Sequence, residues 1–178
     1  MQLTTKRLIL RDVTEDDWRA VHEYAADPEV TRYLPFGPNT EEQTRQFIQR
    51  TIQAQQDDPR RKFELGIVLP RTGELIGGCR VSLEDAGNRS GSIGYILHRD
   101  HWGRGIMTEA ASELLRFGFS ELDMHRIWAT CDELNVASAR VLEKIGMKRE
   151  GLMREDTWME ERWRSTYLYA VLEQEWRP

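Results

Sequence analysis

The sequence has few of the residues that mark metal-binding or disulfide-rich proteins. Its 178 residues include only two cysteines, Cys79 and Cys131, and contain no C-x-x-C or H-x-x-x-H spacing. Each cysteine lies in an apolar run typical of a strand, so we expect two buried free thiols rather than a disulfide or a metal site. These features predict no bound metal and a reducing compartment, most simply the cytoplasm.

Long hydrophobic runs and an excess of positive charge are also lacking. The apolar runs are far shorter than the roughly 20 residues that a transmembrane helix needs. The segment Met1–Arg7 has no apolar centre of the kind found in secretory signals. The 25 basic and 30 acidic residues give a net charge of −5, which argues against non-specific nucleic-acid binding. We therefore expect neither a membrane nor a nucleic acid as partner.

The bulk composition fits one globular unit. A length of 178 residues predicts a single domain over residues 1–178. Hydrophobic residues make up 39% of the chain and charged residues 31%, and the mean hydropathy is −0.64. These values predict a sizeable core beneath a well-solvated surface.

Hydrophobic periodicity and turn residues predict an alternation of strands and helices. Helix starts are indicated by capping boxes that begin at Thr14 and Thr40, by the glycines at 103 and 105, and by Asn135. The Asp27-Pro28 dipeptide is expected to end the first helix, and an aromatic, proline-rich loop is expected over residues 31–39. Strands are predicted over residues 7–11, 63–69, 75–83, 92–97, 126–131 and around 166–171.

Two of the predicted helices differ in their apolar faces. The helix that begins at Thr40 has only a thin apolar stripe, so we expect it on the surface. The helix capped by Asn135 is expected to end at Gly146 and to turn four apolar residues inward: Val136, Ala139, Leu142 and Ile145. The order of elements predicts an α/β (α+β) fold with one mixed sheet covered by helices.

One short stretch between a strand and a helix has the chemistry of an anion site. Residues 101–110 read H-W-G-R-G-I-M-T-E-A, with Gly103 and Gly105 just before the helix. Unpaired N–H groups and the helix dipole favour an anion there, and Thr108, Arg99 and Arg104 add a hydroxyl and positive charge. No Lys follows either glycine, which excludes a mononucleotide P-loop, and Thr108 stands where a dinucleotide fingerprint needs a small residue. By itself the stretch allows either a different phosphate cradle or an ordinary turn.

With its neighbours, this stretch resembles the GNAT superfamily of acyl-CoA-dependent N-acetyltransferases. The resemblance is carried by D-H-W-G-R-G-I-M-T-E-A and, one helix and one strand later, by N-V-A-S-A-R-V-L-E-K-I-G-M. The blocks T-K-R-L-I-L-R-D, D-P-E-V-T-R-Y-L-P and E-G-L-M-R-E are similar to the branch of the ribosomal-protein N-acetyltransferases RimJ and RimL. These blocks come in the right order and cover nearly the whole chain.

The resemblance implies a fold, a co-substrate and a reaction. The fold is a mixed, mostly antiparallel sheet flanked by about four helices, in which parallel strands at residues 92–97 and 126–131 splay apart. Acetyl-CoA is the implied co-substrate, with its pantetheine arm between these strands, and a primary amine is the acceptor. The amine attacks directly in a ternary complex while a strand N–H polarises the thioester carbonyl. The implied cofactor-binding residues are Ile96, Leu97, Trp102, Gly103, Arg104, Gly105, Thr108 and Asn135. The resemblance leaves open whether the protein forms a homodimer.

The sequence departs from the family pattern at two places. Asp100 stands three residues before Gly103, where Gln or Arg is usual, so we expect its side chain to point away from the anion. Leu142 stands where many members carry a tyrosine that acts as general acid, so this role does not carry over. The branch resembles this chain in having a serine at position 138. Ser138 is therefore the candidate to protonate or hydrogen-bond the leaving thiolate, together with Asn135 near the acyl group.

Each candidate also has a purely structural interpretation. Asn135 fits a helix N-cap and Ser138 an ordinary polar residue of a first turn. The general base is not visible in the sequence. Acidic and histidine side chains near the expected site fit either catalysis or plain structural and surface roles: Glu150, Glu155, Asp156, His98 and His101. Glu109 is expected to support the cofactor helix.

The missing base bears on the acceptor. A peptide α-amine has a pKa near 8 and is neutral in roughly one molecule in ten at pH 7, whereas a lysine amine is neutral in well under about one in a thousand. This comparison favours a protein or peptide N-terminal α-amine. Tyr33 and Phe36 either wall the acceptor cleft or cover the core, as do Trp158 and Trp163. Three alternatives to this function remain: a small amine (antibiotic, polyamine or metabolite) as acceptor, a succinyl-CoA-type donor, and a non-catalytic acyl-CoA-binding module.

Overall fold

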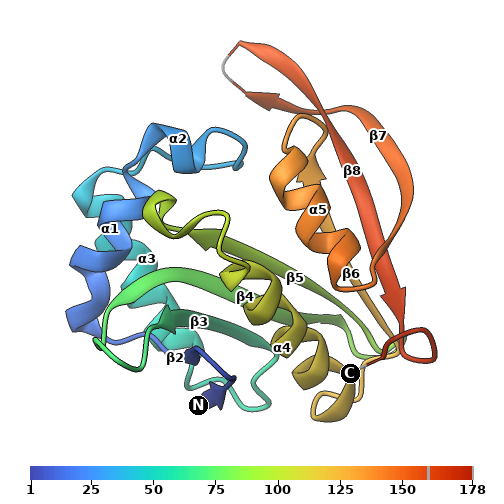
Figure 1. The fold of residues 1–178 in the computed structure, drawn as a ribbon, viewed down its shortest axis with the longest axis horizontal. Helices are drawn as coiled ribbons and strands as arrows, with labels where there is room; N and C mark the ends of the chain where they lie inside the picture. The colour runs from blue at the N-terminus through green and yellow to red at the C-terminus, as the bar shows by residue number, and fades with distance from the viewer. Residues whose placement is uncertain (160, 178) are drawn as a thin grey trace.

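The described residues form one eight-stranded sheet with helices on both faces. The computed structural model describes residues 1–159 and 161–177 (Figure 1). The strand order is β1-β2-β3-β4-β5-β6-β8-β7, and every neighbouring pair is antiparallel except β5–β6. The strands are β1 (Gln2–Thr4), β2 (Ile9–Asp12), β3 (Lys62–Val68), β4 (Leu75–Asp85), β5 (Ser90–Leu97), β6 (Arg126–Asp132), β7 (Lys148–Met159) and β8 (Arg162–Leu172). The helices are α1 (Trp18–Ala25), α2 (Pro28–Thr31), α3 (Glu41–Ala54), α4 (Ile106–Ser120) and α5 (Val136–Lys144), with 3-10 turns η1 (Glu15–Asp17) and η2 (Arg99–His101). The predicted mixed, mostly antiparallel fold is confirmed.

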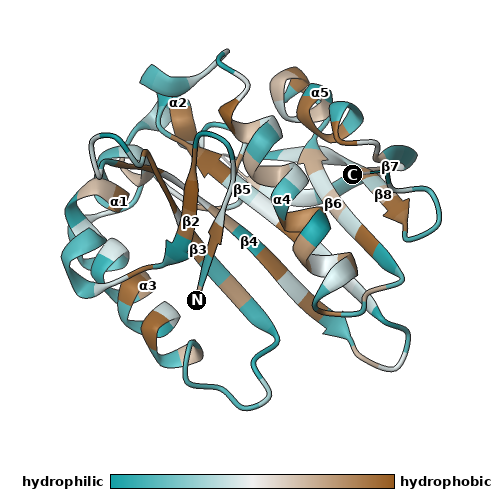
Figure 2. Cartoon of the chain, turned by 60° about the horizontal axis from the view of Figure 1, so that its bottom comes forward, coloured by the Kyte–Doolittle hydropathy of each residue, from teal (hydrophilic) through white to brown (hydrophobic). Residues whose placement is uncertain are grey.

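Two hydrophobic clusters lie on the two faces of the sheet. Neighbouring residues of a strand point to opposite sides, and in β3 Ile67 packs in the cluster of α4 and α5 whereas Val68 packs in the cluster of α1 and α3. In β4, Ile76 likewise packs in the cluster of α4 and α5, and Leu75 packs in the cluster of α1 and α3. Figure 2 shows hydrophobic segments along the central strands and hydrophilic residues over the outer turns of the helices. Both cysteines are free and buried, as expected.

The parallel strands β5 and β6 separate soon after they begin. Their paired register consists of Ser90 with Arg126, Gly91 with Ile127 and Ser92 with Trp128. Beyond these pairs β5 continues to Leu97 along β4, and β6 continues to Asp132 along β8. The two strands therefore form a wedge that is closed at Ser90 and open at Leu97 and Asp132, which confirms the predicted splay.

Several local predictions need correction. β1 and the first part of β7 carry no alternating hydrophobic signal, because β1 has three residues and most of β7 is exposed, so both depend on backbone pairing. Asp27 ends α1 as expected, but its carboxylate also accepts the N–H of Glu29 and caps the single turn α2, which the sequence does not predict and which overlaps the predicted loop at Thr31. The capped helix α3 has the expected polar surface and buries its thin stripe through Ile48.

The prediction that Val136 faces inward is wrong. Its side chain is 56% exposed, whereas Leu142 and Ile145 are buried as expected and Ala139 is half-buried. The first turn of α5 meets the strands through Ser138, which bonds to Tyr95 of β5, and the Val136 side chain lies in solvent. Gly146 adopts a left-handed φ of +89° just past the helix, as the predicted stop requires.

Gly91 provides a test of the closed end of the wedge. A Cβ on Gly91 would lie 2.3 Å from the Ser82 carbonyl oxygen of β4, a backbone atom that moves only if the two strands separate. We expect Gly91→Ala to lower the free energy of unfolding by about 3 kcal/mol, measured by urea denaturation. Gly151→Ala on β7 is the matched control, because nothing lies within 4 Å of its added Cβ. Equal stabilities of the two variants would contradict this account of the closed end.

Candidate active site

The loop between η2 and α4 has the backbone geometry of an anion cradle. Gly103 and Gly105 have left-handed φ values of +72° and +70°, which favour glycine. Gly105 is the N-cap of α4, and the first helical bond runs from the Glu109 N–H to the Gly105 carbonyl oxygen at 3.1 Å. The N–H groups of residues 106–108 precede this bond and have no helical acceptor. Nothing lies within 4 Å of a Cβ built on Gly103, so the loop is open to a ligand there.

Glu109, one turn into α4, fixes this loop to the N-terminal strands. Its carboxylate accepts the Thr5 hydroxyl at 2.7 Å, the Arg7 backbone N–H at 2.8 Å and the Arg7 Nε at 2.6 Å. The same Arg7 guanidinium donates to the Arg104 carbonyl oxygen at 3.0 Å. Burial opposes ionisation of Glu109, but the hydrogen bonds from Thr5 and Arg7 outweigh it and hold the pKa of the carboxyl below its ordinary value. The support that Glu109 was expected to give comes through Arg7.

The residues just before the loop are held by contacts of their own. The His98 Nδ1 accepts the Asp100 N–H at 3.2 Å, and the Asp100 side chain is 73% exposed. His101 lies with its Nε2 3.5 Å from a Glu74 carboxylate oxygen, and Arg99 pairs with Asp27 at 3.2 Å. Both histidines therefore have structural partners.

Trp102 connects the loop to the end of β5. Its indole N–H donates to the Leu97 carbonyl oxygen at 2.8 Å, while much of the ring stays exposed. Ile96 packs toward the α1 and α3 face and Leu97 toward the α4 face. These two residues therefore present backbone rather than side chains to the wedge.

Ser138 and Asn135 lie at the open end of the wedge, in the first turn of α5. The Ser138 N–H donates to the Asn135 Oδ1 at 3.0 Å, so Asn135 is the N-cap that the sequence predicts. The Ser138 Oγ lies 3.0 Å from the Tyr95 hydroxyl of β5. Burial raises the pKa of the neighbouring Cys131 to about 11, although a hydrogen bond with Ser138 partly opposes this. The structure thus brings residues of β5, β6 and α5 together at one point.

Among the acidic candidates for a general base, Glu150 does not share this point. Glu150 makes a two-oxygen pair with Arg126, the first residue of β6, and so lies toward the closed end of the wedge. Hydrogen bonding to Arg126 holds the pKa of Glu150 below its ordinary value. Glu155 and Asp156 are exposed on the irregular stretch of β7 between Met153 and Thr157.

The loop after α2 and the β7–β8 hairpin stand at the open end of the wedge. Both lie at the top of Figure 1, and the buried Arg164 of β8 joins them by donating to the Arg32 carbonyl oxygen at 2.8 Å. Arg164 also lies 3.4 Å from Asp132, the last residue of β6. Tyr33 is half-buried beneath the Arg32 guanidinium, and Phe36 is 47% exposed. Near the hairpin tip the exposed rings of Trp158 and Trp163 pack edge to face.

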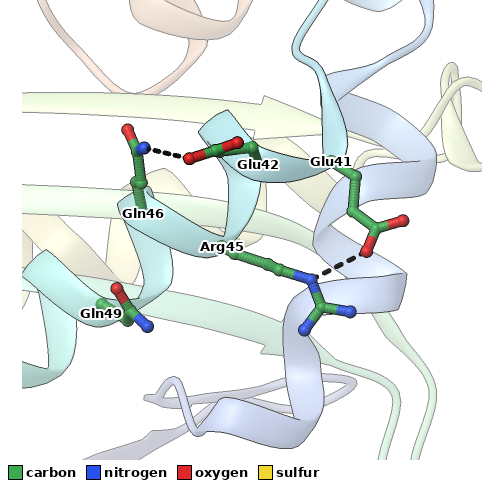
Figure 3. Close-up of a pocket in the computed structure, with 5 residues that line it drawn as sticks. All are labelled: Glu41, Glu42, Arg45, Gln46 and Gln49. Atoms are coloured by element: carbon green, nitrogen blue, oxygen red, sulfur yellow. Dashed lines mark hydrogen bonds and ion pairs between the residues drawn. The ribbon is translucent and has the colours of Figure 1, made fainter.

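Two surface hollows do not include these residues. One, of about 460 Å³, is lined by five side chains of α3 alone, and Arg45 and Gln46 bond back to Glu41 and Glu42 (Figure 3). The other, of about 620 Å³, lies between α4, the end of α5 and the C-terminal segment. Within residues 1–159 and 161–177 no group of side chains could hold a metal ion, and no helix is long and apolar enough to cross a membrane.

Four residues of this region are missing from the sequence-based candidates: Arg7, Tyr95, Asp132 and Arg164. Arg7 lies in the quoted T-K-R-L-I-L-R-D block, which is the one sequence signal among them. Tyr95 is read as part of an apolar strand, and the partners of Arg164 are distant in the sequence.

The contacts of Glu109 predict a pH-dependent loss of stability. Because its folded pKa is depressed, the carboxylate stabilises the fold above its unfolded pKa of about 4.3, and this contribution is lost as the pH falls through the folded value. We expect Glu109→Gln to be less stable than the unchanged protein at pH 7, with the difference shrinking below about pH 4. Denaturation at a series of pH values measures it. Glu23→Gln, on the exposed side of α1, is the control; a difference that persists unchanged in acid would contradict the assignment.

Comparison with known proteins agrees with this geometry. Residues 7–148 match the family described as the Acetyltransferase (GNAT) domain. A Bacillus subtilis (strain 168) protein named as the uncharacterized N-acetyltransferase YnaD is 37% identical over 176 residues, covering 99% of each chain. A solved GNAT-family acetyltransferase from Bacillus anthracis has a TM-score of 0.87 and 35% identity, covering 98% of this chain and 100% of that one.

A more distant relative is named for the acceptor that it acetylates. The [Ribosomal protein uS5]-alanine N-acetyltransferase of Escherichia coli (strain K12) is 27% identical over 188 residues, covering 100% of this chain and 94% of that protein. The family match spans the wedge, the glycine loop and α5, which are the parts that a CoA thioester and its acceptor would need. The chain therefore belongs to the GNAT family and is an acetyl-CoA-dependent N-acetyltransferase.

Proposed function

We propose that this enzyme acetylates the N-terminal α-amine of a protein or peptide. The observation that carries the proposal is the exposure of the aromatic side chains expected to wall the acceptor cleft. Phe36, Trp158 and Trp163 are each about half exposed, and neither of the two surface hollows described above includes Ser138. An extended chain end fits such a site better than a small amine, which an enzyme normally encloses. The likeness to an enzyme named for a ribosomal-protein alanine supports the same choice.

The same geometry supports a position for the cofactor. The pyrophosphate of acetyl-CoA lies against the loop of Trp102, Gly103, Arg104 and Gly105 and the first N–H groups of α4, with the Thr108 hydroxyl beside it. The Trp102 N–H itself is donated to the Arg99 carbonyl oxygen at 3.1 Å. The pantetheine arm lies in the wedge, where its amides meet the backbone of Ile96 and Leu97 on one side. Asn135 lies on the other side, near the acyl end. Free thiols at both cysteines fit work in the cytoplasm.

Acetyl transfer then follows without a covalent enzyme intermediate. The neutral amine attacks the thioester carbonyl carbon, a C–N bond forms, and a β5 N–H stabilises the negative charge on the carbonyl oxygen. The C–S bond breaks, the electron pair goes to sulfur, and Ser138 donates a hydrogen bond to that thiolate. The extra proton on nitrogen leaves to water. Asn135 caps α5 by accepting the Ser138 N–H, and the same bond holds the backbone of Ser138 in place.

A panel of acceptors tests the proposed substrate class. Thiol release from acetyl-CoA is measured with peptides that carry a free α-amine, with Nα-blocked lysine peptides and with spermidine, and succinyl-CoA serves as the alternative donor. We expect turnover of the free N-termini with acetyl-CoA, rising between about pH 7 and pH 8 as the α-amine loses its proton. Turnover confined to spermidine or to lysine side chains would overturn the proposed acceptor. Tight CoA binding with no turnover at all would overturn catalysis.

A pair of glycine variants tests the cofactor loop. Gly103→Ala adds a methyl group to the open face of the loop at a φ of +72°, so it costs backbone strain and also blocks close approach of a phosphate. Gly73→Ala, in the turn between β3 and β4, has nearly the same φ of +74° and equally open surroundings. We expect both to lose about 1 kcal/mol of stability, but only Gly103→Ala to raise the Kd for CoA, by roughly tenfold. Calorimetric titration with CoA measures the Kd. Equal CoA affinities of the two variants would contradict phosphate binding at this loop.

A further inference from the structure

Tyr95 is a polar side chain inside the wedge that the proposed mechanism does not yet use. It lies on β5 beyond Ser92, the last residue paired with β6, and opposite Cys79 of β4. Its ring is half-buried and packs against the core cluster of α4 and α5. Its hydroxyl therefore reaches out of an apolar setting toward the first turn of α5.

Two short contacts join this hydroxyl to Ser138. The Tyr95 Oη lies 3.0 Å from the Ser138 Oγ and 3.2 Å from the Ser138 carbonyl oxygen. The Ser138 N–H is held at the same time by Asn135. The backbone and the hydroxyl of Ser138 are thus fixed by groups from two different elements, β5 and the N-cap of α5.

A serine hydroxyl without such a contact turns freely among its rotamers. The Tyr95 hydroxyl has one proton and two acceptors on Ser138, the carbonyl oxygen at 3.2 Å and the nearer Oγ at 3.0 Å. When it donates to the Oγ, the serine proton is left for a second acceptor. A hydrogen bond accepted by an oxygen also strengthens the bond that the same group donates. The contact therefore both limits the rotation of Ser138 and improves it as a donor.

We propose that Tyr95 is a positioning residue for acetyl transfer, whose hydroxyl donates to the Ser138 Oγ and directs the serine O–H at the sulfur of the departing CoA. The proposal rests on the role of Ser138 given above. No proton passes through Tyr95: the C–S bond breaks, sulfur keeps the electron pair, and both hydroxyls retain their protons. Burial raises the pKa of Tyr95 above its ordinary value, which agrees with a donor that stays protonated.

A double-mutant cycle tests the coupling of the two hydroxyls. Tyr95→Phe, Ser138→Ala and the double variant are compared by kcat and by KM for acetyl-CoA, with the best acceptor from the panel. We expect Tyr95→Phe to lower kcat by roughly tenfold with KM unchanged, and to have no further effect once Ser138 is alanine. The pH limbs of kcat stay in place, because the tyrosine does not titrate in the reaction.

Tyr169→Phe is the matched control. Tyr169 is a buried strand tyrosine whose hydroxyl also bonds to α5, at 3.3 Å from the Glu143 Oε1, but it does not contact Ser138. We expect its kcat to be unchanged. An equal loss in Tyr169→Phe, or a loss from Tyr95→Phe that persists in the Ser138→Ala background, would overturn the positioning role and leave a structural one.

The outcome is separable from the acceptor proposal. Hydrolysis of acetyl-CoA without amine uses water as acceptor and releases the same thiolate, so the cycle can be repeated whatever amine the enzyme prefers. If Ser138→Ala leaves both reactions unchanged, the serine role fails and the Tyr95 proposal fails with it. If Ser138→Ala slows them and Tyr95→Phe does not, the Tyr95 proposal alone is overturned.

Discussion

The structure depends on the early end of the β5–β6 pairing. Each strand stays paired on its outer side, β5 with β4 up to Leu97 and β6 with β8 up to Asp132, so neither can bend across to close the wedge. Backbone N–H and C=O groups that face a gap need partners, because leaving them buried and unpaired costs free energy comparable to a lost hydrogen bond. An extended ligand with its own amides supplies those partners, and the pantetheine arm of acetyl-CoA is such a ligand. The wedge therefore accounts for the cofactor of the family in terms of backbone pairing.

The closed end of the wedge is held by contacts that the open end lacks. The Arg89 carbonyl oxygen accepts the His125 N–H at 2.7 Å, and the Arg89 guanidinium bonds to Asp123, just before β6. Arg89 adopts a left-handed φ of 50°, a conformation that persists in a non-glycine residue only when several contacts impose it. The Ser92 hydroxyl adds a bond to Glu84 of β4 at the last paired position. β5 and β6 are thus joined firmly at one end. They separate at the other end because β5 continues along β4 and β6 continues along β8.

What could be predicted from the sequence is what depends on near neighbours in the chain. The glycines at 103 and 105, the cap at Asn135 and the buried cysteines follow from local patterns, and the structure places them as expected. Tyr95, Arg7 and Arg164 could not be found in this way, because their partners are distant in the sequence. The separations are 43 positions for Tyr95, 97 to 102 for Arg7, and 32 and 132 for Arg164. Val136 shows the converse error: helical periodicity turns it inward, but the first turn of α5 meets the strands through Ser138, and Val136 stays exposed. Periodicity predicts which face of a helix is apolar, whereas burial depends on the surrounding fold.

Asp100 shows how the cradle tolerates a carboxylate beside an anion site. Its N–H is taken by His98 and its side chain is largely in water, where solvent and salt weaken its repulsion of a phosphate. Arg99, which the sequence suggests as a nearby cation, is paired with Asp27 and so compensates little of that charge. Besides the exposed Arg104, attraction for an anion comes from the backbone N–H groups at the start of α4, whose direction depends on the left-handed glycines and on the bond from Arg7 to the Arg104 carbonyl oxygen. The proposed pyrophosphate site therefore depends on the loop conformation as well as on side-chain charge.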